Sequence, residues 1–238
     1  MTRELRLGDI AVDVVLKDIK NLHLSVHPPT GRVRIAAPST MHFDAIRVFA
    51  ISNLGWIRRQ QGKLLDQERE TEREFIERES HYVWGRRYLL TIVEAEAAPS
   101  VELGHNRMIL RIRKGAAEAN RRETVESWYR ALIREAVPPL IAKWERILKV
   151  SVDRISVQRM RTRWGSCTPA RRSIRLNTDL AKKPRECLEY ILVHELIHLI
   201  EPTHNARFVT LLDNVLPNWK LRRQLLNRLP VRHEEWIY

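Results

Sequence analysis

The sequence predicts an α+β fold, because strand-type alternation and helix-type periodicity both recur along its 238 residues. Residues 4–37 alternate between polar and apolar side chains in the manner of strands. Residues 121–150 carry a long helical pattern, and further helical patterns follow towards the C-terminus. We expect a boundary between an N-terminal region of hairpins, helix and strands (1–117) and a C-terminal domain (118–238).

The N-terminal elements are predicted from local patterns. NLHLSVH and RVRIAAP read as two strands of a hairpin, with Thr30-Gly31 in the connection. Residues 41–66 read as one amphipathic helix whose apolar side includes Ile46 and Ile57. Two further strands are expected over 81–95 and 106–114.

The C-terminal elements begin with the helix over 121–150, which Pro138-Pro139 should break or kink because proline lacks the backbone donor. DRISVQRMRTRWGSC (153–167) and RRSIRLN (171–177) read as two strands joined by a turn around residues 167–169. A helix should start at Pro184, a residue suited to the first helical position. Helices are expected, in order, over 184–200, 206–216 and 219–229.

The charge balance of the chain is strongly basic. The chain has 42 Lys and Arg against 29 Asp and Glu, a net charge of +13. Residues 151–185 hold ten basic and two acidic side chains. This excess indicates either a solvated basic surface or a binding surface for DNA or another polyanion, and composition alone leaves both open.

The number of cysteines and the length of the apolar segments indicate the cellular compartment of the protein. Cys167 and Cys187 are the only cysteines, which is no disulfide framework and fits a reducing cytoplasm. The N-terminal residues show no secretory signal, and no apolar run approaches the roughly 18–20 residues of a membrane helix. We therefore expect a cytoplasmic protein without membrane spans.

The stretch VHELIHLIEPTHN (193–205) holds the pattern His-Glu-x-x-His at His194, Glu195 and His198. Four helical residues advance about 400°, so the two imidazoles project about 40° apart and roughly 6 Å along the axis. Two neutral imidazoles at this spacing can share one Zn²⁺. Glu195 lies about 100° round from His194, where it is suited to reach a water beside the metal.

A third ligand is offered by His204. Pro202 disfavours continuation of the helix, so the chain can turn and bring His204 back to the metal, with Thr203 as a candidate cap of the next helix. Random placement would give the two-histidine pattern in roughly 3% of such chains and the third histidine with it in about 0.1%. CLEYILVHELIHLI is apolar nearly all round, and buried polar groups are costly unless paired or ligating. The sequence therefore predicts a Zn²⁺ cofactor.

The second feature is RMRTRWGSC, followed by RRSIRLN. An extended substrate can add to a free sheet edge beside a metal helix, and 171–177 is our candidate for that edge strand. Gly165 would allow close backbone approach. Cys187 lies about 10 Å along the helix from His194, too far to ligate the same metal.

Together, RTRWGSC, SIRLN and VHELIHLIEPTHNARF resemble the YgjP-like metallopeptidase family and, more distantly, the SprT-like and WLM zinc proteases. AIRVFAISNLGWIRRQ also resembles a helix of that family, although Val209 stands where the family usually has Trp. The resemblance implies that 118–238 is a zincin-like zinc metallopeptidase domain. It also implies that three histidines are zinc ligands and that a glutamate is catalytic, namely His194, His198, His204 and Glu195.

The expected mechanism is peptide hydrolysis in a protein or peptide substrate. Zn²⁺ would polarise a water and the substrate carbonyl, while Glu195 takes the proton of the water and passes it to the leaving amine. Arg163 and Tyr190 are candidates for an electrophilic helper. The candidate substrate-binding residues are Arg163, Trp164, Gly165, Ser166, Arg175 and Tyr190.

Two other readings stay open from the sequence. A different zinc hydrolase, acting on another amide or on nucleic acid, would share the ligands and be recognised by its own turnover. A nucleic-acid-binding module with a structural metal would bind in a strongly salt-dependent way without hydrolysis. A peptidase acting on nucleic-acid-associated proteins would combine these readings. The sequence leaves the oligomeric state open.

Overall fold

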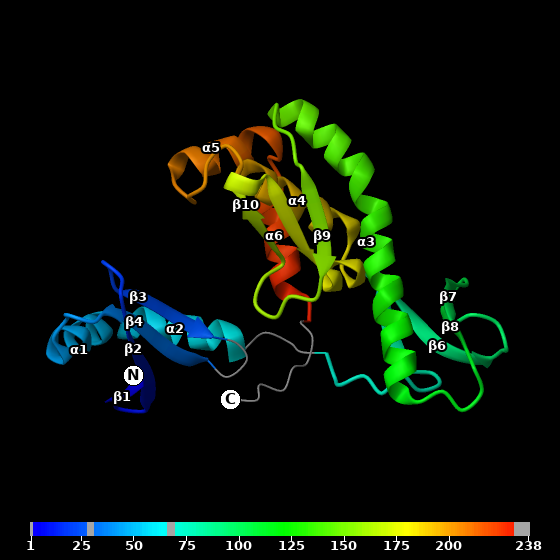
Figure 1. The fold of residues 1–238 in the computed structure, drawn as a ribbon, viewed down its shortest axis with the longest axis horizontal. Helices are drawn as coiled ribbons and strands as arrows, with labels where there is room; N and C mark the ends of the chain where they lie inside the picture. Colours follow the sequence, from blue (N-terminus) through cyan, green and yellow to red (C-terminus); the bar gives the residue numbers. More distant parts are fainter. Residues whose placement is uncertain (1, 28–30, 66–69, 231–238) are drawn as a thin grey trace. The chain divides into compact units, whose positions relative to one another are not determined.

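A computed structural model describes residues 2–27, 31–65 and 70–230, and the expected turn over 28–30 lies outside them (Figure 1). The predicted α+β class is confirmed: the described residues form six α-helices and three small sheets. They divide into two compact units, one within residues 1–70 and one within residues 71–229. The boundary expected at 117/118 therefore falls inside the second unit. None of the helices described has both the length and the apolar character of a membrane span.

The first unit is a mixed sheet covered by two helices. The sheet order is β1-β2-β4-β3, with β2 and β4 parallel and the outer pairs antiparallel. Alternate strand residues such as Val12 and Val33 pack with Ile46 and Ile57 of the helices. The helix predicted over 41–66 is two helices, because it is interrupted at Asn53. The elements are β1 Thr2–Leu7, β2 Ile10–Lys17, β3 His23–His27, β4 Arg32–Pro38, α1 Phe43–Ser52 and α2 Leu54–Leu65.

The second unit begins with a sheet of order β5-β6-β8-β7 and the long helix α3. Buried residues of the sheet, such as Leu90 and Leu110, share one hydrophobic core with Val125 and Tyr129 of α3. This shared core is why residues 71–117 belong with the C-terminal part of the chain. The sequence did not predict β7. The elements are β5 Ser80–Val83, β6 Arg86–Glu94, β7 Ser100–Leu103, β8 Arg107–Ile112 and α3 Glu118–Leu148.

Helix α3 runs through Pro138 and Pro139 without a break, and Figure 1 shows that it is bent. A proline inside a helix costs about 3 kcal/mol, through a lost hydrogen bond and a steric clash. Buried side chains on both sides of the pair, including Ile133 and Trp144, hold the helix to the core. Tertiary packing therefore outweighs the tendency of the two prolines to end the helix.

A three-stranded sheet follows α3. The strands are β9 Arg154–Gln158, β10 Gly165–Thr168 and β11 Ser173–Asn177, in the order β10-β11-β9. The single strand predicted over 153–167 is therefore wrong: residues 159–164 form a loop that crosses from one edge of the sheet to the other. The prediction that 171–177 is an edge strand is also wrong, because β11 pairs with β10 on one side and with β9 on the other. The two edge strands of this sheet are β10 and β9.

Three α-helices complete the unit: α4 Arg185–Ile197, α5 Ala206–Val215 and α6 Trp219–Arg228. Pro184 is the residue that precedes α4, and the helix ends three residues before the expected Ile200. Nine of the thirteen α4 residues are buried, as its apolar sequence predicted. The helix packs against the β9–β11 sheet, α3, α5 and α6, so a polar side chain on it has few ways to reach water.

Glu189 of α4 joins three helices. Its carboxylate accepts hydrogen bonds from Lys143 Nζ (2.8 Å) and Trp144 Nε1 (3.1 Å) of α3, and from Arg222 Nη1 (2.7 Å) of α6. Burial raises the pKa of Glu189, but the hydrogen bonds and charges of Lys143 and Arg222 outweigh it, so the pKa lies below the ordinary value of 4.5. A depressed pKa means that this carboxylate stabilises the fold above about pH 4.5 and does so less as the pH falls.

Replacing Glu189 by Gln should lower the free energy of unfolding by about 1.5–3 kcal/mol at pH 7, because hydrogen bonds to a charged group are lost. The difference from the wild type should shrink as the pH falls below 4.5 and through the lowered pKa of the wild-type carboxylate, because that group then becomes protonated as well. Denaturant unfolding at pH 7 and over an acidic pH series measures both effects. Glu186→Gln, at an exposed position of the same helix, is the control. Equal stability of Glu189→Gln and the wild type at pH 7 would contradict the prediction.

Candidate metal centre

Three histidines of the second unit lie together. His194 is in the last turn of α4, His198 caps the C-terminus of that helix, and His204 lies in the connection to α5. One ring nitrogen of each histidine falls within 4.8 Å of the others, and the Nε2 atoms of His194 and His204 are 2.9 Å apart. The structure therefore brings together the three residues that the sequence nominated as a ligand set.

The connection between α4 and α5 turns His204 towards the helix. The N–H of Glu201 still donates to the carbonyl of Ile197 (2.8 Å), and the Glu201 carboxylate then accepts from Thr203 Oγ1 (2.9 Å). The expectation that Thr203 caps α5 is wrong, since Asn205 does so by accepting from the N–H of Phe208 (3.0 Å). Thr203 instead tightens the turn, which reverses the chain within a few residues of the end of α4.

The chemistry of this donor set fits a divalent cation. Metal ions bind neutral imidazole. Burial lowers the pKa of His194 to about 3, and repulsion between a protonated His194 and its neighbours His198, His204 and Arg223 adds to this effect, so its ring is neutral. His198 approaches the Glu201 carbonyl oxygen through Nδ1 (3.1 Å), a contact that orients the ring and leaves Nε2 for a metal. The cluster holds three nitrogen donors, and among the described residues no fourth protein donor joins them.

Aromatic side chains pack behind the histidines. The buried ring of Phe208 lies 4.9 Å from His194, 4.8 Å from His198 and 4.8 Å from His204, measured between ring centroids. Tyr190 meets His194 edge-on at 6.1 Å and stacks on Trp219 at 6.3 Å. Tyr190 is itself buried, which favours a role in holding His194 over contact with a substrate. The feature of the sequence that could have placed Phe208 beside the histidines is its spacing of four residues from His204.

Glu195 is the buried carboxyl beside the cluster, with 5% of its surface exposed. Burial raises the pKa of Glu195 to about 7, against the opposing effects of the positive charge of Arg163 and a hydrogen bond from the backbone of Cys167. A carboxyl group with a pKa in this range can exchange protons near neutral pH. A bound dication would favour the ionised form and lower the pKa again.

Gly165 is where the loop before β10 meets Glu195. A Cβ at position 165 would lie 2.8 Å from Glu195 Oε1, 2.9 Å from Glu195 Cγ and 2.9 Å from Ile191 Cγ2. Distances this short are essentially never found for a real Cβ, so only glycine fits without a shift. The close approach that the sequence suggested for Gly165 is therefore an approach to Glu195.

The other nominated substrate-binding residues divide by sheet face. Gly165 is on the face of β10 that packs against α4, and side chains alternate along a strand. Ser166 and Arg175 are register partners and lie on the opposite face, so the structure does not bring them to the histidines.

Trp164 is half-buried, and Lys183 Nζ lies 5.9 Å from the centroid of its ring. Burial and the charge of Glu195 raise the pKa of Cys167 to about 11, so this thiol is protonated.

Asn177 is a residue that our sequence reading missed. Its buried side chain donates through Nδ2 to the carbonyls of Met160 (2.7 Å) and Arg163 (2.9 Å). These bonds tie the crossing loop to the end of β11 and thereby fix the chain that leads into Gly165. The only signal in the sequence was the asparagine that closes SIRLN, where an apolar residue would continue the strand.

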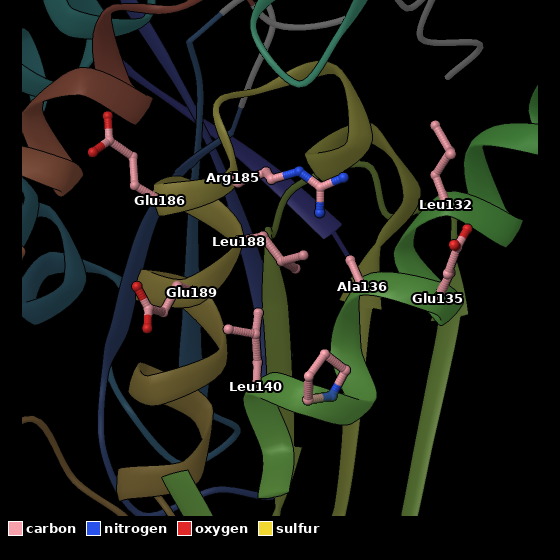
Figure 2. A pocket seen from close by; sticks show the side chains of 9 residues that line it. Leu132, Glu135, Ala136, Leu140, Arg185, Glu186, Leu188 and Glu189 are labelled. Carbon is pink, nitrogen blue, oxygen red and sulfur yellow. The ribbon is translucent and has the colours of Figure 1, made fainter. Parts of the chain in front are cut away.

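A cavity of about 400 Å³ lies between α3 and α4. Figure 2 shows Arg185 reaching across it, with the apolar side chains of Ala136, Leu140 and Leu188 below and that of Leu132 at the α3 side. None of the three histidines lines this cavity. The cavity is therefore separate from the histidine cluster.

Comparison with known proteins points to a protease family. The family model of the YgjP-like metallopeptidase domain matches residues 20–229. Among curated proteins, a search finds no match. Among solved structures, the chain is similar to the metallopeptidase zymogen of Pyrococcus abyssi abylysin, with a TM-score of 0.36 and 21% identity. That similarity covers 41% of this chain and 99% of the abylysin chain.

Proposed function

Because this chain belongs to the YgjP-like metallopeptidase family, we propose that it is a zinc-dependent peptidase. In this proposal, His194, His198 and His204 hold the metal and Glu195 is the general base. The observation that carries it is the grouping of three histidine nitrogens within 4.8 Å, beside a buried carboxyl group. Three nitrogen donors with an open fourth position are typical of catalytic zinc sites, whereas structural sites use four protein ligands.

The proposed chemistry divides between the metal and the chain. When bound, zinc supplies Lewis acidity for the substrate carbonyl and lowers the pKa of a water. The Glu195 carboxylate accepts the proton of the attacking water and delivers it to the leaving amine. The Cys167 backbone and Gly165 hold that carboxylate in place. Phe208 keeps the inner side of the histidines dry, which strengthens every electrostatic interaction there.

The finer parts of the proposal concern substrate and location. The family supports a protein or peptide substrate. The ten basic residues of 151–185 support nucleic-acid-associated proteins as one source of substrates. Both cysteines are free thiols, which supports a reducing compartment such as the cytoplasm.

Metal analysis of the purified protein tests the ligand set. The wild type should hold about one zinc per chain, the stoichiometry of a single catalytic site. His204→Ala should lose most of this zinc, because two imidazoles on one helix bind far more weakly than three. The control is His105→Ala, at an exposed position outside the cluster. Zinc retained in His204→Ala, or no zinc in a folded and reconstituted wild type, would refute the proposed site.

Activity tests the reaction itself. Chelation should abolish cleavage of an unfolded protein substrate, and added zinc should restore it. Cleavage that persists in metal-free protein would overturn the proposed function.

A further inference from the structure

The two edge strands of the sheet β5-β6-β8-β7 differ in how they are covered. Beside β5, the carbonyl of Tyr82 accepts from Tyr129 Oη of α3 (2.9 Å), and the backbone N–H of Trp84 donates to the carbonyl of Ala181 (2.8 Å). Within the part of the chain that the structure describes, no such partner lies along the outer side of β7. An uncovered strand edge is a template for the backbone of another chain.

The outer side of β7 presents unpaired backbone groups. Gly104 donates to the carbonyl of Arg107 (2.8 Å) where the hairpin between β7 and β8 closes. Bonded and non-bonded pairs alternate along an antiparallel ladder. Counting back from this bonded pair through the register, the N–H and C=O groups of Leu103 and Val101 point away from β8. An incoming chain therefore meets a donor and an acceptor at each of these residues.

A groove with a volume of about 610 Å³ runs beside this edge. One wall is the start of β7 and the other is a stripe along α3, whereas no residue of β8 lines it, so the groove lies on the outer side of β7. The stripe is roughly 16 Å long and can face about five residues of an extended chain. Its residues, spaced by three and four on one helix face, are Asn120, Glu123, Thr124, Ser127, Trp128 and Ala131.

The groove has the position that a further strand of the sheet would take. Helix α3 packs against β7, so the stripe beyond that strand is the surface on which an added strand would rest. Alternate side chains of the added strand would point towards α3. There the half-buried ring of Trp128 and the methyl group of Ala131 favour an apolar residue.

The groove is acidic, although the chain as a whole carries a net charge of +13. Among the described residues that line it, Glu123 alone is charged; its side chain is 74% exposed, and Arg130 Nη2 lies 3.9 Å from it. A carboxylate here favours a segment that contains Lys or Arg and disfavours nucleic acid. A second copy of the chain is also disfavoured, because two-fold pairing would bring together two identical acidic surfaces.

The groove is far from the histidines. Figure 1 shows β7 and α5 towards opposite ends of the second unit, and His204 lies in the connection that leads into α5. A substrate that reaches both places must be long and extended. We propose that the groove between β7 and α3 binds an extended, basic segment of a protein substrate by adding it to β7 as a strand. This role in recruitment rests on the proposed peptidase function and names the substrate class, which is unfolded protein chains.

Peptide binding tests the addition of a strand. The probe has about seven residues, alternates Val and Lys, and carries one central Phe; the protein is full-length Glu195→Gln, which should not cleave it. Bound peptide should slow amide hydrogen exchange at Val101 and Leu103 at least about tenfold. A version with Glu in place of Lys should bind more weakly. Unchanged exchange at both amides would overturn the inference.

Methylation of the peptide backbone tests the hydrogen bonds directly. Only every second residue of an added strand donates to β7. Methylating one alternating set of peptide nitrogens should therefore weaken binding at least about tenfold, whereas methylating the other set should not. Equal affinity of the two methylated peptides would overturn strand addition.

Variants test the groove. Ala131→Arg fills it from an exposed helix position and should weaken peptide binding at least about tenfold, while Ala142→Arg, at an exposed α3 position outside the groove, is the matched control. Leu103→Pro removes an outward N–H but no bond to β8, so it should bind peptide more weakly than Leu103→Ala, which keeps that N–H. Wild-type affinity in Ala131→Arg, or equal affinity of the two Leu103 variants, would contradict the proposed site.

Cleavage separates this inference from the proposed function. Hydrolysis of a short fluorogenic peptide reports whether the protein is a peptidase. The KM for an unfolded protein substrate, divided by the KM for the short peptide, reports recruitment and should rise about tenfold in Ala131→Arg but not in Ala142→Arg. An unchanged ratio with the short peptide still cleaved would overturn recruitment and leave the peptidase standing. Protection of the Val101 and Leu103 amides that grows with protein concentration, without any peptide, would instead assign the edge to a second copy.

Discussion

Replacing Glu195 by Gln should lower kcat for peptide cleavage by about 10²–10⁴, the usual contribution of a positioned general base. The glutamine amide has nearly the same shape and its oxygen can still accept the hydrogen bond from the Cys167 backbone, but it cannot take up a proton. Zinc content should stay at the wild-type level, because the three histidines are untouched. Parallel measurement of kcat and bound zinc therefore separates the loss of a base from the loss of a site.

The direction in which the same substitution changes the stability of the metal-free protein can also be predicted. The pKa of Glu195 is raised by burial, from 4.5 to about 7, so the folded protein holds this proton more tightly than the unfolded chain. For the metal-free wild type, this contribution is present below about pH 4.5 and is lost as the pH rises through 7. Metal-free Glu195→Gln should then be at least as stable as the metal-free wild type at pH 8. Wild-type turnover in the zinc-loaded variant would exclude Glu195 as the base.

The grouping of the three histidines was predictable because local chain geometry brings them together. The spacing of His194 and His198 places both rings on one side of any helix, and Pro202 requires a turn soon after. The apolar character of the surrounding sequence also predicted the burial of Glu195. These conclusions needed only local chain geometry, and the structure brings the three histidines together in that way.

The sheet order was not predictable in the same way. Periodicity shows that a segment is a strand but not which strands are neighbours, so β11 was mistaken for an edge. Trp219 is linked to the histidines only through its stack on Tyr190, which joins two separate helices. A break or kink was expected at Pro138-Pro139, and α3 is bent but unbroken; its continuation depends on buried neighbours that a local rule does not include.

Apart from the three proposed ligands and the proposed base, the residue with the largest expected effect is Gly165. In Gly165→Ala, the new methyl group would lie 2.8 Å from Glu195 Oε1 and 2.9 Å from Ile191 Cγ2. Glu195 and Ile191 belong to the packed helix α4, so neither has free space into which it can withdraw. The loop must move away from α4 or the carboxylate must rotate, and either displaces the proposed base from its working position.

We expect kcat to fall by about 10²-fold in Gly165→Ala, the loss typical of a displacement near 1 Å in a catalytic group. The free energy of unfolding should fall by about 1–3 kcal/mol from overpacking. Zinc content should be retained, because the substituted residue contacts the glutamate and not the histidines. Gly104→Ala is the matched control, since a Cβ there would meet only the Arg107 carbonyl at an ordinary 3.7 Å. Wild-type kcat in Gly165→Ala would mean that this contact does not position Glu195, whereas loss of zinc would mean that the strain spreads along α4 to the ligands.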